Sequence, residues 1–331
     1  MPKAKNINNL KKFSGIEIVG DSNLTLTKDI SNYFGVKAIH SVYNRFADTE
    51  SLIDVTDGKH FKDKLVFIIS QFSFPFLRDD PDMGSINDQL AQVFFSAHQI
   101  NAHRAKHIIL ITPYLPYSRQ SRSVSGVYIG PLQAVGLFCK AVGIKDVVSC
   151  ELHEDLCKSI FPLPLHAICL KDIWYKVISQ NFSLDEIGNA CFLSPDRGGV
   201  ERVKRLAKAF GASWAFVEKK RVAKDKSIAL GLVGDVKDKF IILVDDIVDT
   251  GGTAVEASKM AIKKGAKLIV SCFTHGIFSE DSIDMIEKSD IEKVWVSNSV
   301  FIGDIKLGTK FSVVSINDLI VDYIDKFIEK V

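Results

Sequence analysis

Short apolar runs alternate with amphipathic stretches along most of this chain. The runs have the length of buried strands, and the stretches between them repeat apolar residues at helical spacing. Strands are predicted at Ile16–Gly20, Leu65–Ser70, Ile108–Thr112, Val147–Cys150, Ala190–Ser194, Trp214–Val217, Phe240–Val244, Leu268–Phe273 and Val294–Ser297. Helices are predicted at Thr25–Phe34, Gly84–His103, Pro131–Val142, Gly199–Phe210, Gly251–Lys264 and Ile316–Ile328.

This alternation predicts an α/β fold with two similar three-layer domains, each with a central, mostly parallel sheet covered by helices. A length of 331 residues lets each of two domains bury its own core. The prolines of Phe161-Pro162-Leu163-Pro164 break the pattern and mark the predicted junction. We therefore expect domains at residues 13–160 and 161–310, and a C-terminal helix within 311–331 that packs back on the first domain.

Composition excludes several classes of protein. Apolar residues make up 47% of the chain and charged residues 25%, which is ordinary for a soluble globular protein. A net charge of +2 gives no reason to expect nucleic acid as a partner. No apolar stretch approaches a membrane span and the N-terminus lacks a signal-peptide pattern, so we expect a cytoplasmic protein without membrane association. The six cysteines lack Cys-x-x-Cys spacing, which favours buried thiols over disulfides or zinc ligands.

The most informative segment runs from Phe240 to Ala254, where an apolar strand stops at the carboxylates Asp245 and Asp246. A third carboxylate, Asp249, precedes Thr250-Gly251-Gly252-Thr253, and a helix follows. The N–H groups at a helix N-terminus bind anions, glycines let the backbone approach closely, and threonine hydroxyls add donors. The small-residue turn is therefore a candidate phosphate site.

The three carboxylates need a different partner, because they would repel a phosphate. Ribose hydroxyls, which donate hydrogen bonds, or a bridging Mg²⁺ would satisfy them. The alternative is an acidic turn that only caps a helix. The spacing is not that of a Walker loop, Gly-x-x-x-x-Gly-Lys-Ser/Thr.

The string Val244-Asp245-Asp246-Ile247-Val248-Asp249-Thr250-Gly251-Gly252-Thr253 resembles the 5-phosphoribosyl 1-pyrophosphate (PRPP) binding loop. Type I phosphoribosyltransferases and PRPP synthetases (ribose-phosphate pyrophosphokinases) share this loop. The resemblance implies phosphoribosyltransferase-like domains. It also implies that Asp245 and Asp246 hold the ribose 2- and 3-hydroxyls and that the residues from Asp249 to Thr253 hold the 5-phosphate.

A second segment separates these two families. After the strand Ile108–Thr112 the chain reads Pro113-Tyr114-Leu115-Pro116-Tyr117-Ser118-Arg119-Gln120-Ser121-Arg122, a rigid aromatic and cationic surface that suits a nucleotide. An exposed loop with two arginines is common, so the residues alone leave its role open. PRPP synthetases carry a similar Pro-Tyr-x-x-Tyr-x-Arg-Gln-Asp-Arg, which phosphoribosyltransferases lack. The resemblance implies that Arg119, Gln120 and Arg122 bind ATP.

Further matches to PRPP synthetases follow in the family's order, from Gly15 to about Leu319. Asn44-Arg45-Phe46-Ala47-Asp48-Thr49-Glu50 resembles an Arg-Phe-x-Asp-Gly-Glu loop that reaches the adenine from a neighbouring subunit, which implies this role for Phe46, Asp48 and Glu50. Ser194-Pro195-Asp196-Arg197-Gly198-Gly199 resembles Ser-Pro-Asp-x-Gly-Gly, which implies that Asp196 lies near the metal.

Two matches concern catalysis. Glu218-Lys219-Lys220-Arg221 resembles the Lys-x-Arg of the family's mobile catalytic loop. Alone it could be a solvated charge run, or the tip of a flexible lid before the polar, strand-poor stretch Ala223–Ser227. His153 could be an ordinary histidine at a strand end, but it matches a family histidine that contacts the ATP phosphates and the metal. The resemblance implies catalytic roles for Lys219, Arg221 and His153.

The implied reaction transfers the diphosphoryl group of ATP to the 1-hydroxyl of ribose 5-phosphate, giving PRPP and AMP. Such chemistry depends on in-line positioning and charge neutralisation. Mg²⁺ is the implied cofactor, with His153 and Asp196 as its candidate ligands. ATP and ribose 5-phosphate are the implied substrates, and the implied assembly is a homo-oligomer between a dimer and a hexamer.

The chain departs from the family's motifs at several positions. Ser121 stands where the family has Asp, and Glu151-Leu152-His153-Glu154 stands where it has Asp-Leu-His-Ala. Thr49 replaces a glycine. The segment from Val124 to Pro131 replaces a basic segment linked to ADP regulation, so we expect weakened ADP inhibition. These departures leave two alternatives: a catalytically weak, regulatory synthetase-associated protein, and a phosphoribosyltransferase.

Overall fold

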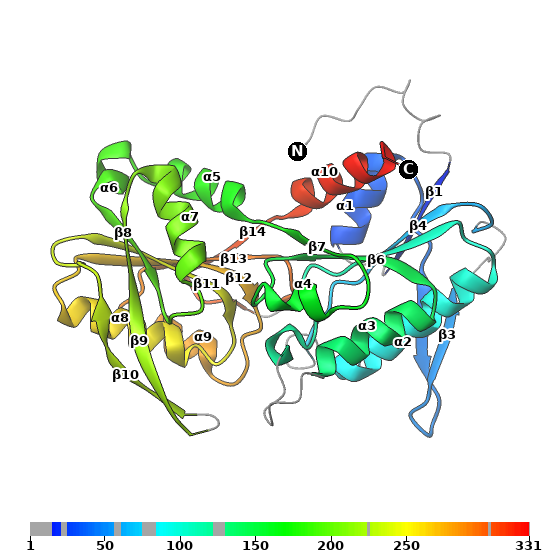
Figure 1. Cartoon of the computed structure of the whole chain (residues 1–331), viewed down its shortest axis with the longest axis horizontal. Coiled ribbons are helices and arrows are strands. Elements are labelled where there is room, and N and C mark those ends of the chain that lie inside the picture. The colour runs from blue at the N-terminus through cyan, green and yellow to red at the C-terminus, as the bar shows by residue number, and fades with distance from the viewer. Residues whose placement is uncertain are drawn as a thin grey trace. The chain divides into compact units, whose positions relative to one another are not determined.

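The computed structural model describes residues 15–20, 25–55, 61–74, 84–121, 130–223, 226–303 and 306–330, and its side-chain description leaves out 42–44, 220–223 and 226–229. The described chain divides into two compact units, whose elements are labelled in Figure 1. Unit 1 falls within Met1–Ile168, Ser299–Asp304 and Ile316–Val331, and unit 2 within Cys169–Asn298 and Ile305–Ser315. Each unit has a mostly parallel sheet with helices packed on it, which confirms the predicted fold class.

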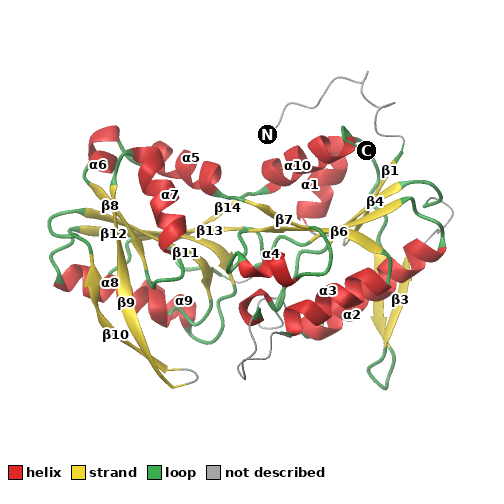
Figure 2. Ribbon diagram, in the orientation of Figure 1, coloured by secondary structure: helices red, strands yellow, loops and turns green. Residues whose placement is uncertain are grey.

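Unit 1 is built on a five-stranded parallel sheet. In sheet order its strands are β1 (Ile16–Gly20), β4 (Leu65–Ile69), β5 (His107–Ile111), β6 (Ile144–Cys150) and β7 (Leu165–Ile168). Its helices are α1 (Thr25–Phe34), α2 (Ile86–Ala102), the 3-10 turn η4 (Ser118–Gln120), α3 (Pro131–Ala141), α4 (Leu156–Ile160) and α10 (Asn317–Ile328). Helices α1 and α10 lie on one face of the sheet, and α2 and α3 lie on the other (Figure 2). Because β4 and β5 are covered on both faces, they read in the sequence as continuous apolar runs.

Unit 2 is built on a seven-stranded sheet. In sheet order its strands are β10 (Lys226–Val233), β9 (Ser213–Ala223), β8 (Ala190–Ser194), β11 (Phe240–Val248), β12 (Leu268–Gly276), β13 (Lys293–Ser297) and β14 (Phe311–Val314). Its helices are α5 (Lys171–Asn181), α6 (Leu184–Gly188), α7 (Val200–Phe210), α8 (Gly252–Lys263) and α9 (Ser282–Glu287). Only the β9–β10 pair is antiparallel within this described sheet. The strand order reverses between β8 and β11, and ligands of open α/β sheets bind at such a point.

Two antiparallel hairpins were not predicted from the sequence. β2 (Ser41–Arg45) pairs with β3 (Ser51–Val55) in a separate two-stranded sheet, and β3 packs against α2. β9 and β10 form the second hairpin, in which Lys226 pairs with Ala223. The prediction that Ala223–Ser227 is poor in strand is therefore wrong. Polar residues at a sheet edge can pair through their backbones without producing an apolar alternation.

The boundaries between the two units fall at residues other than those expected from the sequence. Strand β7 follows the proline-rich segment and pairs with β6, so unit 1 extends to Ile168. Strand β14 belongs to the unit 2 sheet, whereas α10 belongs to unit 1. There α10 is bonded to α1: the Tyr33 hydroxyl donates to Asp325 Oδ2 at 3.1 Å, and Asn317 Nδ2 donates to Asp29 Oδ2.

All six cysteines are free thiols, and only Cys169 is exposed. Burial raises the pKa of the Cys139 thiol to about 12 and also raises the pKa of Cys272, so these sulfurs stay protonated and inert at neutral pH. Among the described residues, no helix combines the length and the apolar character that crossing a membrane requires.

Leu206→Ala is expected to lower the free energy of unfolding by about 2–5 kcal/mol, because this α7 side chain is 1% exposed. Leu184→Ala removes the same atoms from a side chain that is 81% exposed and should change that free energy by less than about 0.5 kcal/mol. All three tryptophans, Trp174, Trp214 and Trp295, lie in unit 2, so urea unfolding followed by tryptophan fluorescence reports on both variants. Equal midpoints would contradict the packing of α7.

Candidate active site

The strand order of unit 2 brings two acidic segments together. Asp196 follows β8, and Asp245 and Asp246 lie within β11, the neighbouring strand. Both segments reach the carboxyl edge of the sheet where the strand order reverses. The charge of Asp196 acts on Asp245, as expected of neighbouring carboxylates. Unit 2 thus places the predicted ribose-binding aspartates beside the predicted metal ligand.

The turn between β11 and α8 has the geometry of an anion site. Gly251 caps α8 with φ 78° and ψ −17°, a left-handed conformation that favours glycine. The first N–H groups of an α-helix lack partners within the helix, and Thr250 and Thr253 are exposed beside them. Asp249 is oriented by the Ser279 hydroxyl, which donates to its Oδ1. The turn can therefore present backbone and hydroxyl donors to a phosphate.

Arg202 on α7 is a buried cation between the two aspartates of β11. Its Nη1 lies 3.2 Å from Asp246 Oδ1 and 3.6 Å from Asp245 Oδ1, and its side chain is 10% exposed. The backbone N–H of Asp246 also donates to Asp245 Oδ1 at 2.9 Å. These contacts orient both carboxylates before a ligand arrives.

Burial, with the charge of Asp246, raises the pKa of Asp245 well above its usual range, and the cation of Arg202 opposes that rise. Asp196 is held differently, since its Oδ1 accepts the backbone N–H of Gly198 at 2.7 Å and that of Gly199 at 3.3 Å. The site therefore combines a carboxylate fixed by backbone donors with a pair controlled by one arginine.

Sequence reasoning missed Arg202. A signal was present, because helical spacing places Arg202 on the same face of α7 as Val203, Leu206 and Ala207, all of which are buried. An arginine on the apolar face of a helix that follows an acidic loop requires an anionic partner.

Lys219, predicted to be catalytic, lies on β9 with its side chain 14% exposed. Its Nζ is 3.3 Å from Glu256 Oε2 on α8, the helix that begins at the phosphate turn. The structure thus holds this cation against the element predicted to bind the ribose phosphate. Glu256 was also missed, since one glutamate on a helix gives no sequence signal. The backbone of Arg221 lies in β9, but its side chain is outside the described residues.

Unit 1 brings together predicted nucleotide-binding residues from two loops. Arg119 and Gln120 lie on η4 after β5, and His153 follows β6, the neighbouring strand. All three side chains are exposed. Cys157 Sγ donates to the Ser118 carbonyl at 3.4 Å, which ties α4 to η4. A guanidinium, an amide and an imidazole at one sheet edge are suitable partners for phosphate oxygens.

The tyrosines of this loop are structural, and the prediction that they form an aromatic binding surface is wrong for Tyr114. Tyr114 is 6% exposed, and its ring centre lies 6.0 Å from that of Phe74. Tyr117 has a left-handed conformation with φ 64°, and its hydroxyl donates to Asn87 in the first turn of α2. Both rings therefore fix the loop that carries Arg119.

Phe46, Asp48 and Glu50 lie on an exposed turn that closes the β2–β3 hairpin. The Glu50 N–H donates to Asp48 Oδ1 at 3.0 Å, and the Phe46 N–H donates to the Glu50 carbonyl at 2.9 Å. This turn is a separate element from the loops of Arg119 and His153. An exposed phenylalanine ring between two carboxylates suits contact with another molecule.

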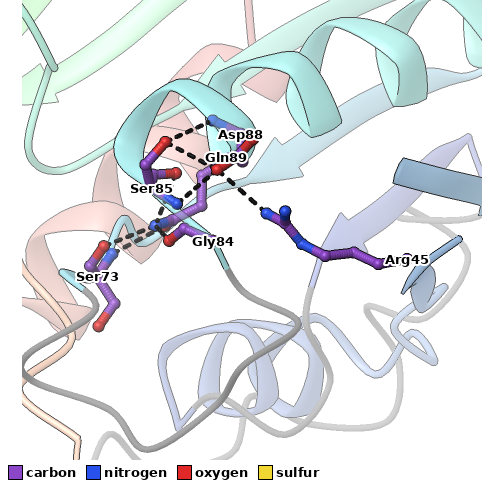
Figure 3. A network of polar contacts seen from close by, with 6 residues as sticks. All are labelled: Arg45, Ser73, Gly84, Ser85, Asp88 and Gln89. Atoms are coloured by element: carbon purple, nitrogen blue, oxygen red, sulfur yellow. Dashed lines mark hydrogen bonds and ion pairs between the residues drawn. The ribbon is translucent and has the colours of Figure 1, made fainter. Parts of the chain in front are cut away.

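Arg45, at the base of this hairpin, is anchored to the start of α2 (Figure 3). Its Nη2 lies 3.1 Å from Asp88 Oδ2, which also accepts the Ser85 N–H at 2.7 Å. The hydrogen bonds from Ser85, helped by Arg45, lower the pKa of Asp88 below its usual range. Gln89 then bonds both backbone groups of Ser73, at 2.7 and 3.0 Å. The first turn of α2 therefore fixes the hairpin to the body of unit 1.

Two predictions fall on parts of the chain outside the described residues. Arg122, predicted to bind ATP, lies in 122–129. The segment from Val124 to Pro131, which motivates weakened ADP inhibition, is described only from Gly130 onward. Both stay predictions.

The carboxylates of unit 2 fit a magnesium ion. Mg²⁺ prefers oxygen ligands, retains several waters and binds through one or two carboxylates together with substrate phosphates. Asp196, Asp245 and Asp246 supply such oxygens at one edge of the sheet, whereas His153 offers a nitrogen, which suits softer metals better. Within the described ranges, no group of three or more His, Cys, Asp or Glu side chains is arranged to hold a metal ion, so substrate phosphates and water would have to supply further ligands.

Comparisons with known proteins agree with this geometry. A family model described as the N-terminal domain of ribose phosphate pyrophosphokinase matches residues 17–135, and one described as the phosphoribosyl synthetase-associated domain matches residues 213–330. The crystal structure of phosphoribosylpyrophosphate synthetase from Mycobacterium smegmatis has the same fold, with a TM-score of 0.84, 24% identity and coverage of 96% of this chain and 100% of that chain.

Sequence relatives cover both units. The ribose-phosphate pyrophosphokinase of Fusobacterium nucleatum is 29% identical, over 97% of this chain and 96% of its own. That of Aquifex aeolicus is 30% identical, over 93% of this chain and 94% of its own. Similarity of this extent, together with the two family models and the shared fold, shows that the chain belongs to the ribose-phosphate pyrophosphokinase family.

Proposed function

We propose that this protein is a ribose-phosphate diphosphokinase, which transfers the diphosphoryl group of ATP to the 1-hydroxyl of ribose 5-phosphate and releases PRPP and AMP. The observation that carries the proposal is that one chain combines the acidic turn of unit 2 with the phosphate-binding edge of unit 1. A phosphoribosyltransferase needs only the first of these. The names of the relatives describe the same reaction.

Unit 2 binds the acceptor sugar in this proposal. Asp245 and Asp246 accept hydrogen bonds from the ribose 2- and 3-hydroxyls, and Arg202 keeps them oriented. The turn from Asp249 through Thr250, Gly251 and Gly252 to Thr253 holds the 5-phosphate with backbone and hydroxyl donors. Binding of the sugar at both its hydroxyls and its 5-phosphate fixes the direction of its 1-hydroxyl.

Unit 1 binds the donor nucleotide. Arg119, Gln120 and Arg122 hold its phosphates together with His153, and Phe46, Asp48 and Glu50 contact the adenine bound by a neighbouring subunit. Asp196 would hold Mg²⁺ together with the substrate phosphates, whereas the nitrogen of His153 suits this ion less well. The ion, when bound, neutralises phosphate charge and polarises the group being transferred.

The chain's own residues then position the reacting groups and neutralise the charge on the group being transferred. The sugar's 1-hydroxyl oxygen forms a bond to the β-phosphorus and loses its proton to solvent, while the bond from that phosphorus to the oxygen of the departing AMP breaks and AMP keeps the electron pair. Negative charge on the transferring group is balanced by Lys219 and Arg221. Lys219 must exchange its contact with Glu256 for a contact with a phosphate oxygen. Substrate binding would therefore change the contacts of the β9–β10 hairpin, which carries Lys219.

We also propose a cytoplasmic homo-oligomer between a dimer and a hexamer. Large apolar side chains on α2 and α3 support a protein interface there, since Phe95 and Leu137 are each 53% exposed and Phe138 is 58% exposed. The six free thiols suit a reducing compartment.

A catalytically weak, regulatory relative is the second candidate function. The family model over residues 213–330 carries the description of a synthetase-associated domain. The changes at Ser121 and Glu154 point the same way. Retention of Lys219, Arg221 and His153 favours the enzyme.

The purified protein with Mg²⁺ and ATP is expected to form AMP at a rate that depends on ribose 5-phosphate. Lys219→Ala should lower this turnover by about 10³-fold, because one positioned cation stabilises the charge of phosphoryl transfer by that order. Lys267→Ala is the control, since Lys267 is 67% exposed and pairs only at 3.6 Å with Asp238. Absence of AMP from the wild type would contradict the proposed reaction, and full turnover in Lys219→Ala would contradict the role of Lys219.

Arg202→Met is expected to raise the KM for ribose 5-phosphate by roughly 10–100-fold, since two buried carboxylates lose their cation and their orientation. Because Arg202 opposes the raised pKa of Asp245, its removal should raise that pKa further, and activity should be lost at a higher pH as the solution is acidified.

Two further variants serve as controls for the effect of Arg202→Met on the KM and on the acid limb. Arg202→Lys keeps the charge and should recover part of both effects. Arg205→Met lies on the exposed face of the same helix and should match the wild type. An unchanged acid limb in Arg202→Met would show that Arg202 does not control the aspartates.

A further inference from the structure

Ser121 and Glu154, two departures from the family's motifs, contact each other. The Ser121 hydroxyl donates to Glu154 Oε1 across 33 positions of sequence. Ser121 is 3% exposed and directly follows η4, the turn that carries Arg119 and Gln120. Glu154 directly follows His153. The contact therefore joins the two loops of unit 1 that the proposed function assigns to the nucleotide phosphates.

The acceptor of this contact is a carboxylate. Another bond between the loops, from Cys157 Sγ to the Ser118 carbonyl at 3.4 Å, is buried and uses a weak thiol donor. A hydrogen bond to a carboxylate is about twice as strong as one between neutral groups. Gly130 brings the start of α3 against the same place, since a Cβ there would lie 2.3 Å from the Gln120 carbonyl oxygen. The start of α3 therefore packs closely against the end of η4, beside Ser121.

Together, the departures at Ser121 and Glu154 leave the number of carboxylates at these two positions unchanged. Relative to the family's motifs, the loop after β5 has lost an acid at position 121, and the loop after β6 has gained one at position 154. The glutamate side chain is long enough to reach the shorter serine on the neighbouring loop, and the hydroxyl gives it a donor. The acid has moved from one strand end to the next within the same edge of the sheet.

We propose that Glu154 is a positioning residue for the donor nucleotide: through Ser121 it holds the turn bearing Arg119 and Gln120 in register with His153. This inference rests on the proposed function for the identity of the nucleotide, and it deepens that function by assigning a residue that the family's motifs lack. The two departures, which taken singly favour a catalytically weak relative, are then accounted for together as one relocated acid.

The test measures binding of a non-hydrolysable ATP analogue with Mg²⁺ by calorimetry on the full chain. Glu154→Ala is expected to weaken this binding by about tenfold or more, while the affinity for ribose 5-phosphate, which is bound by unit 2, stays unchanged. Glu154→Gln keeps an acceptor for Ser121 and should lose less. Asp155→Ala, which removes an exposed carboxylate at the next position without a side-chain cap bond, should behave as the wild type.

The deciding variant is the double substitution Ser121→Asp with Glu154→Ala, which returns the acid to the loop after β5. Recovery of nucleotide affinity to within about threefold of the wild type supports the proposal. Analogue affinity in Glu154→Ala equal to that in Asp155→Ala overturns it. A loss in Glu154→Ala that is shared by ribose 5-phosphate binding and is not recovered in the double variant also overturns it, because that pattern indicates general loss of folding.

Binding and turnover separate this inference from the function on which it rests. A wild type that binds the analogue but forms no AMP from ribose 5-phosphate would refute the proposed reaction, and the variants would still decide the role of Glu154. A wild type that binds neither the analogue nor ATP overturns both.

Discussion

The organisation of unit 2 depends on how the chain accommodates Asp245 and Asp246 at the end of a buried strand. Two adjacent carboxylates with little access to water repel each other and lose hydration, and burial accordingly raises the pKa of Asp245. Arg202 supplies the opposing charge from α7. Removing one partner of a buried ion pair typically costs about 3–5 kcal/mol. The contact that packs α7 on β11 is therefore also the contact that orients the aspartates of the proposed ribose site.

The glycines around this contact follow from the same constraint. A Cβ at Gly199 would lie 2.5 Å from Ser194 Oγ and 3.3 Å from Arg202 Nη1, so a side chain there would displace the Ser194 hydroxyl and press on the arginine. At Gly251 the left-handed backbone lets β11 turn into α8, and a Cβ would press against Ile286 at 3.3 Å. In a sequence these glycines indicate a phosphate site. In the structure Gly199 also leaves room for Arg202, and Gly251 leaves room for Ile286 of α9, so both glycines contribute to packing.

The sequence predicts the buried parallel strands well, because a strand covered on both faces is apolar throughout. The range predicted for β8 matches the observed strand, and α1 matches its predicted range for a similar reason, since one face is buried. The hairpins β2–β3 and β9–β10 could not be found in this way, because backbone pairing at an edge imposes no apolar period. The site was predicted where residues form a contiguous motif, as at Asp245. It was missed where a partner comes from another element, as with Arg202 and Glu256.

Both units place their candidate site residues at the carboxyl ends of neighbouring parallel strands, but the two edges differ in chemistry. The edge of β8 and β11 gathers carboxylates, which suit the hydroxyls of a sugar, and the edge of β5 and β6 presents Arg119 and His153, which suit phosphates. At such an edge a charged group can come from either of two adjacent loops, because the strand spacing is only about 4.8 Å. The charged groups of such a site should therefore be counted over both loops at the edge and not over one loop. The carboxylate that is absent from position 121 on the loop after β5 is present as Glu154 on the loop after β6, where it accepts a hydrogen bond from Ser121. The departure at Ser121 is therefore interpreted together with Glu154 and not by itself.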